Sequence, residues 1–373
     1  MNKDPQYERY QRQILLKQFG EAGQEKLLQS KVLVIGAGGL GCAALQYLAA
    51  AGIGMIGIVD DDVVSLNNLH RQVLFATDDI GLKKADIAAS KLKQLNPEIK
   101  IVALNLRLTN QNALEIIRDY DIVVDSTDNF SSRYIINDAC VLSNKPLIFG
   151  AVSQFEGQVA VFNYGKNLTN RGVNYRDLFP YPLKENEVLN CAEAGVLGVV
   201  PGIIGSMQAN EAIKLITGIG APLVDRLLTY NSLTNEMYVL SLSVNNEVDA
   251  FIPKNEIDFR NTDYEWLCSS QINPASEINI EAFDDLLKQN NATVIDVREY
   301  GEQPFVDEFK HLQVPLSQLR KRQHYFTGET IIAFCQTGKR SHEAVEILKN
   351  GSNRSKKIYS LRGGITEWKR TKK

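Results

Sequence analysis

Residues 32–41 read VLVIGAGGLG, and this stretch predicts the fold of the first part of the chain. Four apolar residues fit a buried strand, the glycines fit a tight turn, and an alanine-rich helical pattern follows. Gly36, Gly38 and Gly41 have the G-x-G-x-x-G spacing that lets a phosphate approach the backbone and the start of a helix. The turn therefore indicates a nucleotide site at the end of the first strand.

Outward from this turn, short apolar runs alternate with helical patterns over residues 31–150. The expected strands are Val32–Ile35, Met55–Val59, Ile99–Leu104, Ile122–Val124 and Leu147–Phe149, and the expected helices are Leu40–Ala51, Lys83–Leu95 and Arg133–Leu142. Such alternation predicts a parallel, doubly wound sheet. Residues 151–165 and 226–243 read as antiparallel strands instead. The fold class is therefore α/β, with a Rossmann-like mixed sheet made of a parallel half and an antiparallel half.

Composition excludes several classes of protein. The chain has 373 residues with 44% apolar and 23% charged residues, which predicts packed cores in two or three domains. A net charge of −3 argues against a nucleic-acid partner, and the apolar runs are too short for a membrane span. The polar N-terminus and an odd number of widely spaced cysteines indicate reduced thiols in a cytoplasm. The cysteines are Cys42, Cys140, Cys191, Cys268 and Cys335.

The residues that follow the glycine turn suit a triphosphate better than a dinucleotide. Asp60 closes the next strand, where a ribose-binding carboxylate belongs. Arg71 and Lys84 add cations, and Asp128 adds a carboxylate after the fourth strand. Phosphates bridged to protein carboxylate by Mg²⁺ need such groups, whereas the diphosphate of NAD or FAD needs neither the extra cations nor the metal. A nucleotide-dependent oxidoreductase remains the competing reading of the glycine turn.

Five motifs resemble those of the MoeB/ThiF/HesA adenylyltransferases, the bacterial relatives of ubiquitin-activating enzymes. They are RYQRQ at 9–13, the glycine turn, SLNNLHRQ at 65–72, STDN at 126–129 and CAEAGV at 191–196. The similarity covers about residues 5–243. It implies ATP-dependent adenylation of the C-terminal glycine of a ubiquitin-fold sulfur carrier that ends in Gly-Gly, of the MoaD/ThiS kind. No general base is required, because the attacking carboxylate is already an anion at pH 7.

The resemblance also implies roles for individual residues. Asp60 would bind ribose, and Asp128 would bind Mg²⁺. The phosphates would be bound by Asn68, Arg71 and Lys84 and approached by Gly36, Gly38, Gly39 and Gly41. In a homodimer, Arg12 would reach the nucleotide of the other subunit. The polar 166–200 segment would clamp the carrier's tail. Cys191 would form a thioester or mixed disulfide with the carrier. In the alternative function, a protein-modifier activating enzyme, Cys191 would pass a thioester onward, beside a regulatory or phosphatase-like C-terminal domain.

The chain departs from this family at a structural zinc site. Many members hold zinc with two C-x-x-C pairs, but Asn174 and Asp177 stand at the first pair and the second is absent. One amide and one carboxylate do not make a tetrahedral site of soft ligands. We therefore expect no zinc, and apolar packing around Tyr175, Leu178 and Phe179 in its place.

A second informative run, IIAFCQTGKRS at 331–341, places Cys335 at the end of a strand. A short loop with Gly338 and two cations follows, and a helix is expected to start at Ser341. Backbone N–H groups, the two cations and the helix dipole would converge on the sulfur and stabilise a thiolate or persulfide anion. The expected cradle consists of Gln336, Thr337, Gly338, Lys339 and Arg340.

Residues 276–373 resemble a single rhodanese domain, on the strand 293–299, His311, the Cys335 loop, the run 361–365 and Trp368. The resemblance implies that Cys335 is a persulfide carrier supplied by a donor such as a cysteine desulfurase. Four residues separate Cys335 from Arg340, one fewer than in the cradle of protein tyrosine phosphatases, so phosphatase activity is the runner-up. The expected domains are an adenylyltransferase at 1–243, a linker at 244–275 and the rhodanese unit at 276–373.

Overall fold

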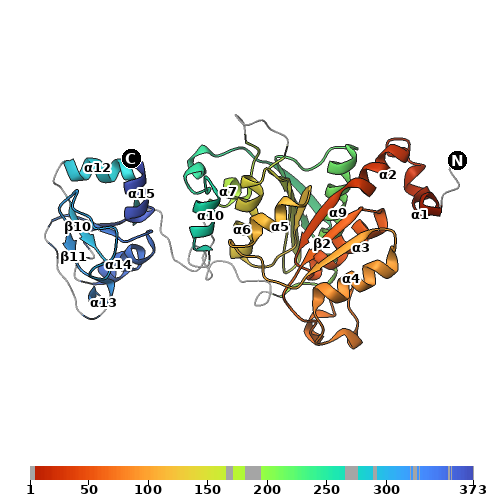
Figure 1. The fold of residues 1–373 in the computed structure, drawn as a ribbon, viewed down its shortest axis with the longest axis horizontal. Coiled ribbons are helices and arrows are strands. Elements are labelled where there is room, and N and C mark those ends of the chain that lie inside the picture. The colour runs from red at the N-terminus through yellow and green to blue at the C-terminus, as the bar shows by residue number, and fades with distance from the viewer. Residues whose placement is uncertain are drawn as a thin grey trace. The chain divides into compact units, whose positions relative to one another are not determined.

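The computed structural model describes residues 5–164, 171–180, 195–264, 276–288, 292–319, 321, 326, 328–351, 353 and 355–372. The chain divides into two compact units, Met1–Ser269 and Ser270–Lys373, each built around its own sheet (Figure 1). Among the described residues, no helix has the length and apolar character that a membrane crossing requires.

The first unit contains an eight-stranded sheet with the order β3-β2-β1-β4-β5-β6-β7-β8. Its strands are β1 (Lys31–Ile35), β2 (Met55–Val59), β3 (Lys100–Leu104), β4 (Ile122–Asp125), β5 (Leu147–Ser153), β6 (Glu156–Phe162), β7 (Arg226–Asn231) and β8 (Glu236–Ser241). The strands β1 to β5 pair in parallel, and the pairs from β5 to β8 are antiparallel. The predicted mixed sheet is confirmed.

Helices cover both faces of this sheet. Alternate residues of β1 point to opposite faces, so Val32 and Val34 belong to one core and Leu33 and Ile35 to the other. The first core packs under α2 (Gly20–Gln29), α3 (Gly39–Ala51), α4 (Lys84–Leu95) and α9 (Val199–Thr217), and the second under α5 (Ala113–Arg118), α6 (Phe130–Leu142) and α7 (Tyr175–Leu178). The remaining elements are α1 (Pro5–Ile14) and two short 3₁₀ turns, η1 (Leu66–Asn68) and η2 (Thr77–Asp79).

The chain after β8 folds onto the first unit as far as Tyr264. It forms η3 (Asn246–Ala250) and α10 (Glu256–Asn261), and Phe259 is completely buried in the second core. The side chain of Asn110 donates to the carbonyl groups of Arg260 and Thr262, each at 2.8 Å. Much of the stretch expected to be a linker therefore packs against α5 and α6.

The second unit has a five-stranded sheet with the order β11-β10-β12-β13-β9, in which all pairs are parallel. Its elements are β9 (Glu277–Ile278), α12 (Ile280–Lys288), β10 (Thr293–Asp296), β11 (Leu312–Gln313), α13 (Leu316–Leu319), β12 (Thr330–Phe334), α14 (Lys339–Asn350), β13 (Lys357–Leu361) and α15 (Gly364–Thr371). The central strand β12 is buried on both faces, and Cys335 follows its last residue. The fold thus places this thiol at the carboxyl edge of the sheet.

Candidate functional site

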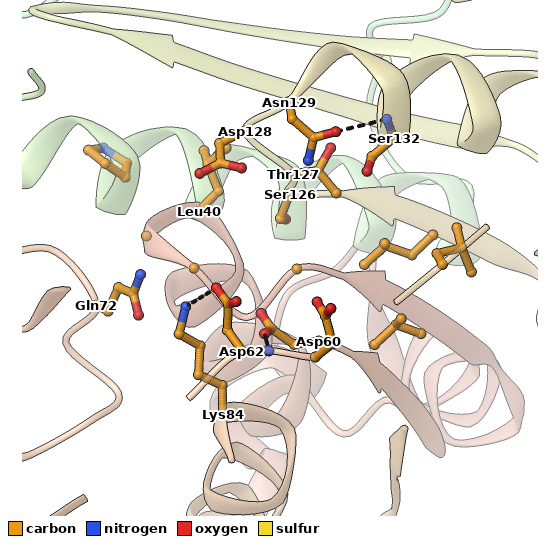
Figure 2. Close-up of a pocket in the computed structure, with 18 of the residues that line it drawn as sticks. Leu40, Asp60, Asp62, Gln72, Lys84, Ser126, Thr127, Asp128, Asn129 and Ser132 are labelled. Atoms are coloured by element: carbon orange, nitrogen blue, oxygen red, sulfur yellow. Dashed lines mark hydrogen bonds and ion pairs between the residues drawn. The ribbon is translucent and has the colours of Figure 1, made fainter. Parts of the chain in front are cut away.

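A cavity of about 360 Å³ lies at the carboxyl ends of β1, β2 and β4 (Figure 2). From β1 the chain runs outward through β2 to β3 and then returns to β4 on the other side of β1, and open α/β sheets bind ligands at such a switch point. Of the predicted nucleotide residues, the cavity is lined by Gly36, Gly38, Gly39, Asp60, Arg71, Lys84 and Asp128. The structure therefore brings together residues that lie up to 92 positions apart in the chain, from Gly36 to Asp128.

The glycine turn joins β1 directly to the start of α3. Gly36 has a φ of +94°, a conformation that glycine adopts without strain. Gly41 does not line the cavity; a Cβ atom there would lie 1.9 Å from the carbonyl oxygen of Gly36. Gly41 therefore has a packing role, since it lets α3 lie close to the glycine turn, and its contact with phosphate stays a prediction. The first N–H groups of α3 remain available to an anion in the cavity.

Asp60 fixes the shape of the turn. Its Oδ2 accepts from the backbone N–H of Ala37 at 2.7 Å, and its Oδ1 accepts from the N–H of Asp62 at 2.9 Å. Burial raises the pKa of Asp60, against the opposing effects of these N–H groups and of Lys84. The carboxylate therefore links β2 to the glycine turn beside the cavity.

Two of the predicted cations reach the cavity by different routes. Lys84, the first residue of α4, is 5% exposed, and its ammonium lies 2.9 Å from Oδ2 of Asp62 (Figure 2). Arg71 is half-buried, and its Nη1 donates to the carbonyl of Asn67 at 3.0 Å. Asn68 lies in η1 and donates to the side chain of Asn67, and it does not line the cavity.

Gln72 is a cavity residue that the sequence did not single out. Its side chain is 4% exposed, and Oε1 is buried without a hydrogen-bond partner. In Figure 2 its amide faces the glycine turn. Because an unsatisfied buried acceptor is costly, a bound ligand that donates to it would recover that free energy. The signals for Gln72 in the sequence were its position next to Arg71 and at the end of the motif SLNNLHRQ.

Hydrogen bonds from buried side chains hold the end of β4 in place. Asp125 is buried and accepts from the N–H and the Oγ1 of Thr127 at 2.9 and 2.7 Å; burial raises its pKa. Gln208 of α9 donates to the carbonyl of Asp125 at 2.6 Å, and Ser126 donates to Gln208 at 3.3 Å. This bracing leaves the following carboxylate, Asp128, exposed at the cavity. Sequence spacing gave no signal for Gln208.

The predicted roles of Arg12 and Cys191 are not tested by the described residues. Arg12 is exposed on α1 and does not line the cavity of this chain, and its role in a homodimer stays a prediction. Cys191 lies outside the described residues, as does much of the expected 166–200 clamp. Of that segment, the structure describes residues 171–180 and 195–200, and Tyr175 packs into the core.

Polar contacts join the segment expected to replace the zinc site to the chain after β8. Tyr175 packs against Tyr134, Phe149 and Phe179 with ring centroids 5.1 to 5.4 Å apart, as the apolar prediction requires. Arg171 pairs with Asp177 at 2.6 Å and with Asp249 at 2.7 Å, which the sequence reading missed. Among the described residues, no cluster of His, Cys, Asp and Glu could hold a metal ion.

The second site is the loop after β12. The sulfur of Cys335, 1% exposed, accepts from the N–H of Gly338 at 3.2 Å and lies 3.7 Å from Oγ of Ser341. Gly338, with φ +99°, precedes α14, which begins at Lys339, two residues before the expected start. The sulfur therefore sits at the N-terminus of a 12-residue helix, where an anion is stabilised.

The N-terminus of α15 holds the backbone of this loop from the other side. The N–H of Ile365 donates to the carbonyl of Cys335 at 2.9 Å, and that of Thr366 donates to Gln336 at 3.1 Å. A Cβ atom at Gly364 would lie 2.5 Å from the Cys335 carbonyl oxygen, so this close approach requires glycine. The run 361–365 thus anchors the thiol loop.

Carboxylates contact both guanidinium groups beside the loop. Arg340 is paired with Glu302 through both of its terminal nitrogens, with Nη2 2.6 Å from Oε2. Arg298 pairs with Asp296, with Nη2 2.7 Å from Oδ2, and its Nη1 lies 3.4 Å from Oε1 of Gln336. The sequence predicted Arg340 as a cradle residue but not its partner Glu302, which lies 38 residues before it.

Comparison with known proteins identifies a family for each of two regions of the chain. A model of the ThiF family matches residues 10–249, and a model of the rhodanese-like domain matches residues 279–371. The probable molybdopterin-synthase adenylyltransferase of Porphyra purpurea is 39% identical over 369 residues, which cover 97% of this chain and 93% of the relative. The adenylyltransferase and sulfurtransferase MOCS3 of Aedes aegypti is 40% identical over 358 residues, covering 91% of this chain and 81% of the relative.

A third relative and a solved structure complete the comparison. The probable adenylyltransferase/sulfurtransferase MoeZ of Mycobacterium tuberculosis is 39% identical over 371 residues, covering 96% of this chain and 92% of the relative. The crystal structure of Escherichia coli MccB with ATP has a TM-score of 0.56 at 24% identity over 66% of this chain and 74% of that chain, a likeness that shows the fold alone. The predicted family, fold class and enzyme class are confirmed: this chain belongs to the ThiF family and carries a rhodanese-like domain after its ThiF region.

Proposed function

We propose that this enzyme uses ATP to adenylate the C-terminal glycine of a ubiquitin-fold sulfur carrier, and that Cys335 supplies the sulfur for a thiocarboxylate. The observation that carries the proposal is the occurrence, in one chain, of a cavity with glycine turn, cations and carboxylates and of a thiol at a helix N-terminus. The relatives named above as adenylyltransferase and sulfurtransferase support it.

In the first step, a carboxylate oxygen of the carrier attacks the α-phosphorus of ATP, and the bond to pyrophosphate breaks. The N–H groups at the start of α3 and the side chains of Arg71 and Lys84 neutralise charge on the phosphates. Asp60 would bind the ribose. Bound at Asp128, Mg²⁺ would offset phosphate charge. The exposed carboxylate and the two nearby cations fit a metal-bound polyphosphate.

In the second step, a persulfide on Cys335 attacks the carbonyl carbon of the acyl-adenylate, and AMP leaves. The product is an acyl disulfide between the carrier and Cys335. A thiol must then attack the Cys335 sulfur, so that the thiocarboxylate leaves and a new disulfide forms. Cys191 or a small-molecule thiol would supply that group, and a further thiol would reduce the disulfide.

The same proposal includes partners beyond this chain. A cysteine desulfurase would load Cys335, and a homodimer would place Arg12 at the partner's nucleotide. The proposal also includes a cytoplasmic location, where the thiols that it requires stay reduced.

ATP–pyrophosphate exchange with a panel of Gly-Gly-tailed carriers tests the first step. We expect exchange that requires one carrier and its intact C-terminal glycine. No exchange with any carrier, while NAD binds to the cavity, would instead support the oxidoreductase reading of the glycine turn.

A further inference from the structure

Arg340 does not present an unopposed positive charge to Cys335. Both of its terminal nitrogens contact the carboxylate of Glu302, a fork-to-fork pair of the strong kind. The hydrogen bonds from Arg340 lower the pKa of Glu302 to about 2, so this carboxylate is ionised throughout the neutral range. Cys335 also raises the pKa of Arg340, although less than Glu302 does, so the guanidinium lies within the influence of the sulfur.

Glu302 is itself held in place. Its Oε1 accepts from the backbone N–H of Glu299 at 2.8 Å, which closes a turn in the segment after β10. The side chains of the pair are 30% and 31% exposed, so a small anion in solution competes with Glu302 for Arg340. The carboxylate of Glu302 therefore already occupies Arg340, a cation of the first turn of α14 that an anion at the loop would otherwise contact.

The second guanidinium is opposed in the same way. Arg298 is 3% exposed and donates to both oxygens of Asp296, and its Nη1 also donates to the carbonyl of Pro304 at 2.9 Å. Each pair has a formal charge of zero. Outside these two pairs, the described groups next to the Cys335 sulfur include the N–H of Gly338, the hydroxyl of Ser341 and the N-terminus of α14.

This balance of charge discriminates between sulfur donors. Thiosulfate carries two negative charges and must approach a thiolate, so it requires unopposed cations. A persulfide ion carries one negative charge on the sulfur that is transferred. Thiosulfate therefore brings one more negative charge to the loop than a persulfide does. The electrostatic cost of that extra charge separates the two donors.

We propose that Glu302, by neutralising Arg340, sets the donor specificity of the Cys335 site against thiosulfate and in favour of persulfides. The proposal rests on the proposed function of Cys335. In the reaction with the favoured donor, the Cys335 thiolate attacks the outer sulfur of R–S–S⁻ and the S–S bond breaks. R–S⁻ leaves with the bonding electrons and takes a proton from water, and Cys335 becomes a persulfide. With thiosulfate the leaving group is sulfite. Glu302 is a positioning residue, because it acts through Arg340.

The test compares Glu302→Gln with wild type in the full-length chain, with thiosulfate or cysteine persulfide as donor and cyanide as acceptor. Cyanide removes the outer sulfur as thiocyanate and regenerates the thiolate. We expect the KM for thiosulfate to fall about tenfold in the variant, because one negative charge near the site is lost. The kcat/KM for cysteine persulfide should change by less than about twofold, and added salt should diminish the gain for thiosulfate.

Glu308→Gln is the matched control, because Glu308 lies in the same segment and its partner is Lys369, at 2.8 Å. It should leave both donors unaffected, and Glu302→Asp, which keeps the charge, should resemble wild type even if Glu302→Gln folds poorly. An unchanged KM for thiosulfate in Glu302→Gln, or an equal fall in Glu308→Gln or Glu302→Asp, would overturn the proposal. Failure of the wild type to form a persulfide at Cys335 with either donor would be a different result, which refutes the proposed function as well.

Discussion

The turn after β1 and the loop after β12 have the same plan but obtain their charges differently. In each, a central parallel strand ends, a loop with a left-handed glycine follows, and a helix begins at its edge. The turn after β1 contains no charged residue, and its cations come from Arg71 and Lys84, on later segments. The loop after β12 contains Lys339 and Arg340 itself. The first therefore makes a site from many strand ends, and the second makes a site within one segment.

The difference follows from the size of the ligand. A nucleotide with three phosphates needs a cavity with groups along its length, whereas one sulfur atom needs a single helix terminus and a few N–H groups. A thiol also lies next to each loop, Cys42 in α3 and Cys335. Only the second thiol has a role in the proposed chemistry, so paired substitutions in the two loops test whether the functions are separable.

The largest expected effect is that of Cys335→Ser. Sulfur transfer to cyanide should fall about a thousandfold or more, since the nucleophile is lost. ATP–pyrophosphate exchange should be unchanged, because no step of adenylation uses this thiol. Parallel assays of the two activities measure both effects. A variant that still produces thiocyanate would show that another cysteine carries the sulfur.

Lys84→Ala should reduce ATP–pyrophosphate exchange by roughly 10²–10³-fold, because a buried cation at the cavity is removed. Lys83→Ala is the matched control, since Lys83 is the exposed neighbour that donates to the carbonyl of Asp61. Sulfur transfer by Cys335 should be normal in both variants. Equal losses of exchange in the two variants would mean that overall charge, rather than the cavity, is responsible.

Gly41→Ala tests the close approach of α3 to β1. A Cβ atom 1.9 Å from the Gly36 carbonyl oxygen forces the backbone to move, which we expect to lower the free energy of unfolding by about 1–3 kcal/mol or more. In Gly202→Ala, an added Cβ has no atom within 4 Å, so this helical control should be neutral or slightly stabilised. Denaturant unfolding of the first unit distinguishes them. A stable Gly41→Ala variant would contradict the packing role of Gly41.

Gln72→Leu should weaken ATP binding by roughly tenfold, because the ligand loses a hydrogen-bonding partner. The same change should leave the free enzyme as stable as wild type or more stable, since Oε1 of Gln72 has no partner in the structure. Binding is measured by titration and stability by thermal unfolding. Lower stability with unaltered ATP affinity would show that Gln72 has a structural role instead.

The smallest expected effect concerns Cys42, whose thiol should be unreactive in the native chain, unlike that of Cys335. Burial raises the pKa of Cys42 to about 12. The thiol is therefore neutral at pH 8, where its thiolate fraction is on the order of 10⁻⁴, and reactivity should increase only as the pH rises toward that value. Mass spectrometry after alkylation at pH 8 should find Cys42 unmodified in the native chain and modified after unfolding. Rapid native modification would contradict this assignment.

Contiguous signals made the two loops predictable from sequence. The glycine spacing of 36–41 and the order of strand, cysteine, cations and helix in 331–341 each lie within about a dozen residues, and both are present in the structure. The strands that close the antiparallel half, expected at 151–165 and 226–243, were predictable for the same reason, because their pattern is local.

Residues that act across the fold were not predictable. Gln208 supports Asp125 from 83 residues away, and Glu302 faces Arg340 from 38 residues away. The sequence around an exposed carboxylate does not indicate which distant cation it will contact. The packing of α10 was missed likewise, since the acidic, weakly periodic composition of 244–275 resembles a linker while Phe259 is fully buried.

Formation of a carrier thiocarboxylate tests the central claim most directly, because it requires both sites. Intact-mass spectrometry of a Gly-Gly-tailed carrier would follow its C-terminus in the presence of the enzyme, ATP, Mg²⁺, a thiol and a persulfide donor. We predict replacement of the carboxylate by a thiocarboxylate with wild type, no conversion with Lys84→Ala, and acyl-adenylate without thiocarboxylate with Cys335→Ser. Equal thiocarboxylate yields from Cys335→Ser and wild type would contradict the account.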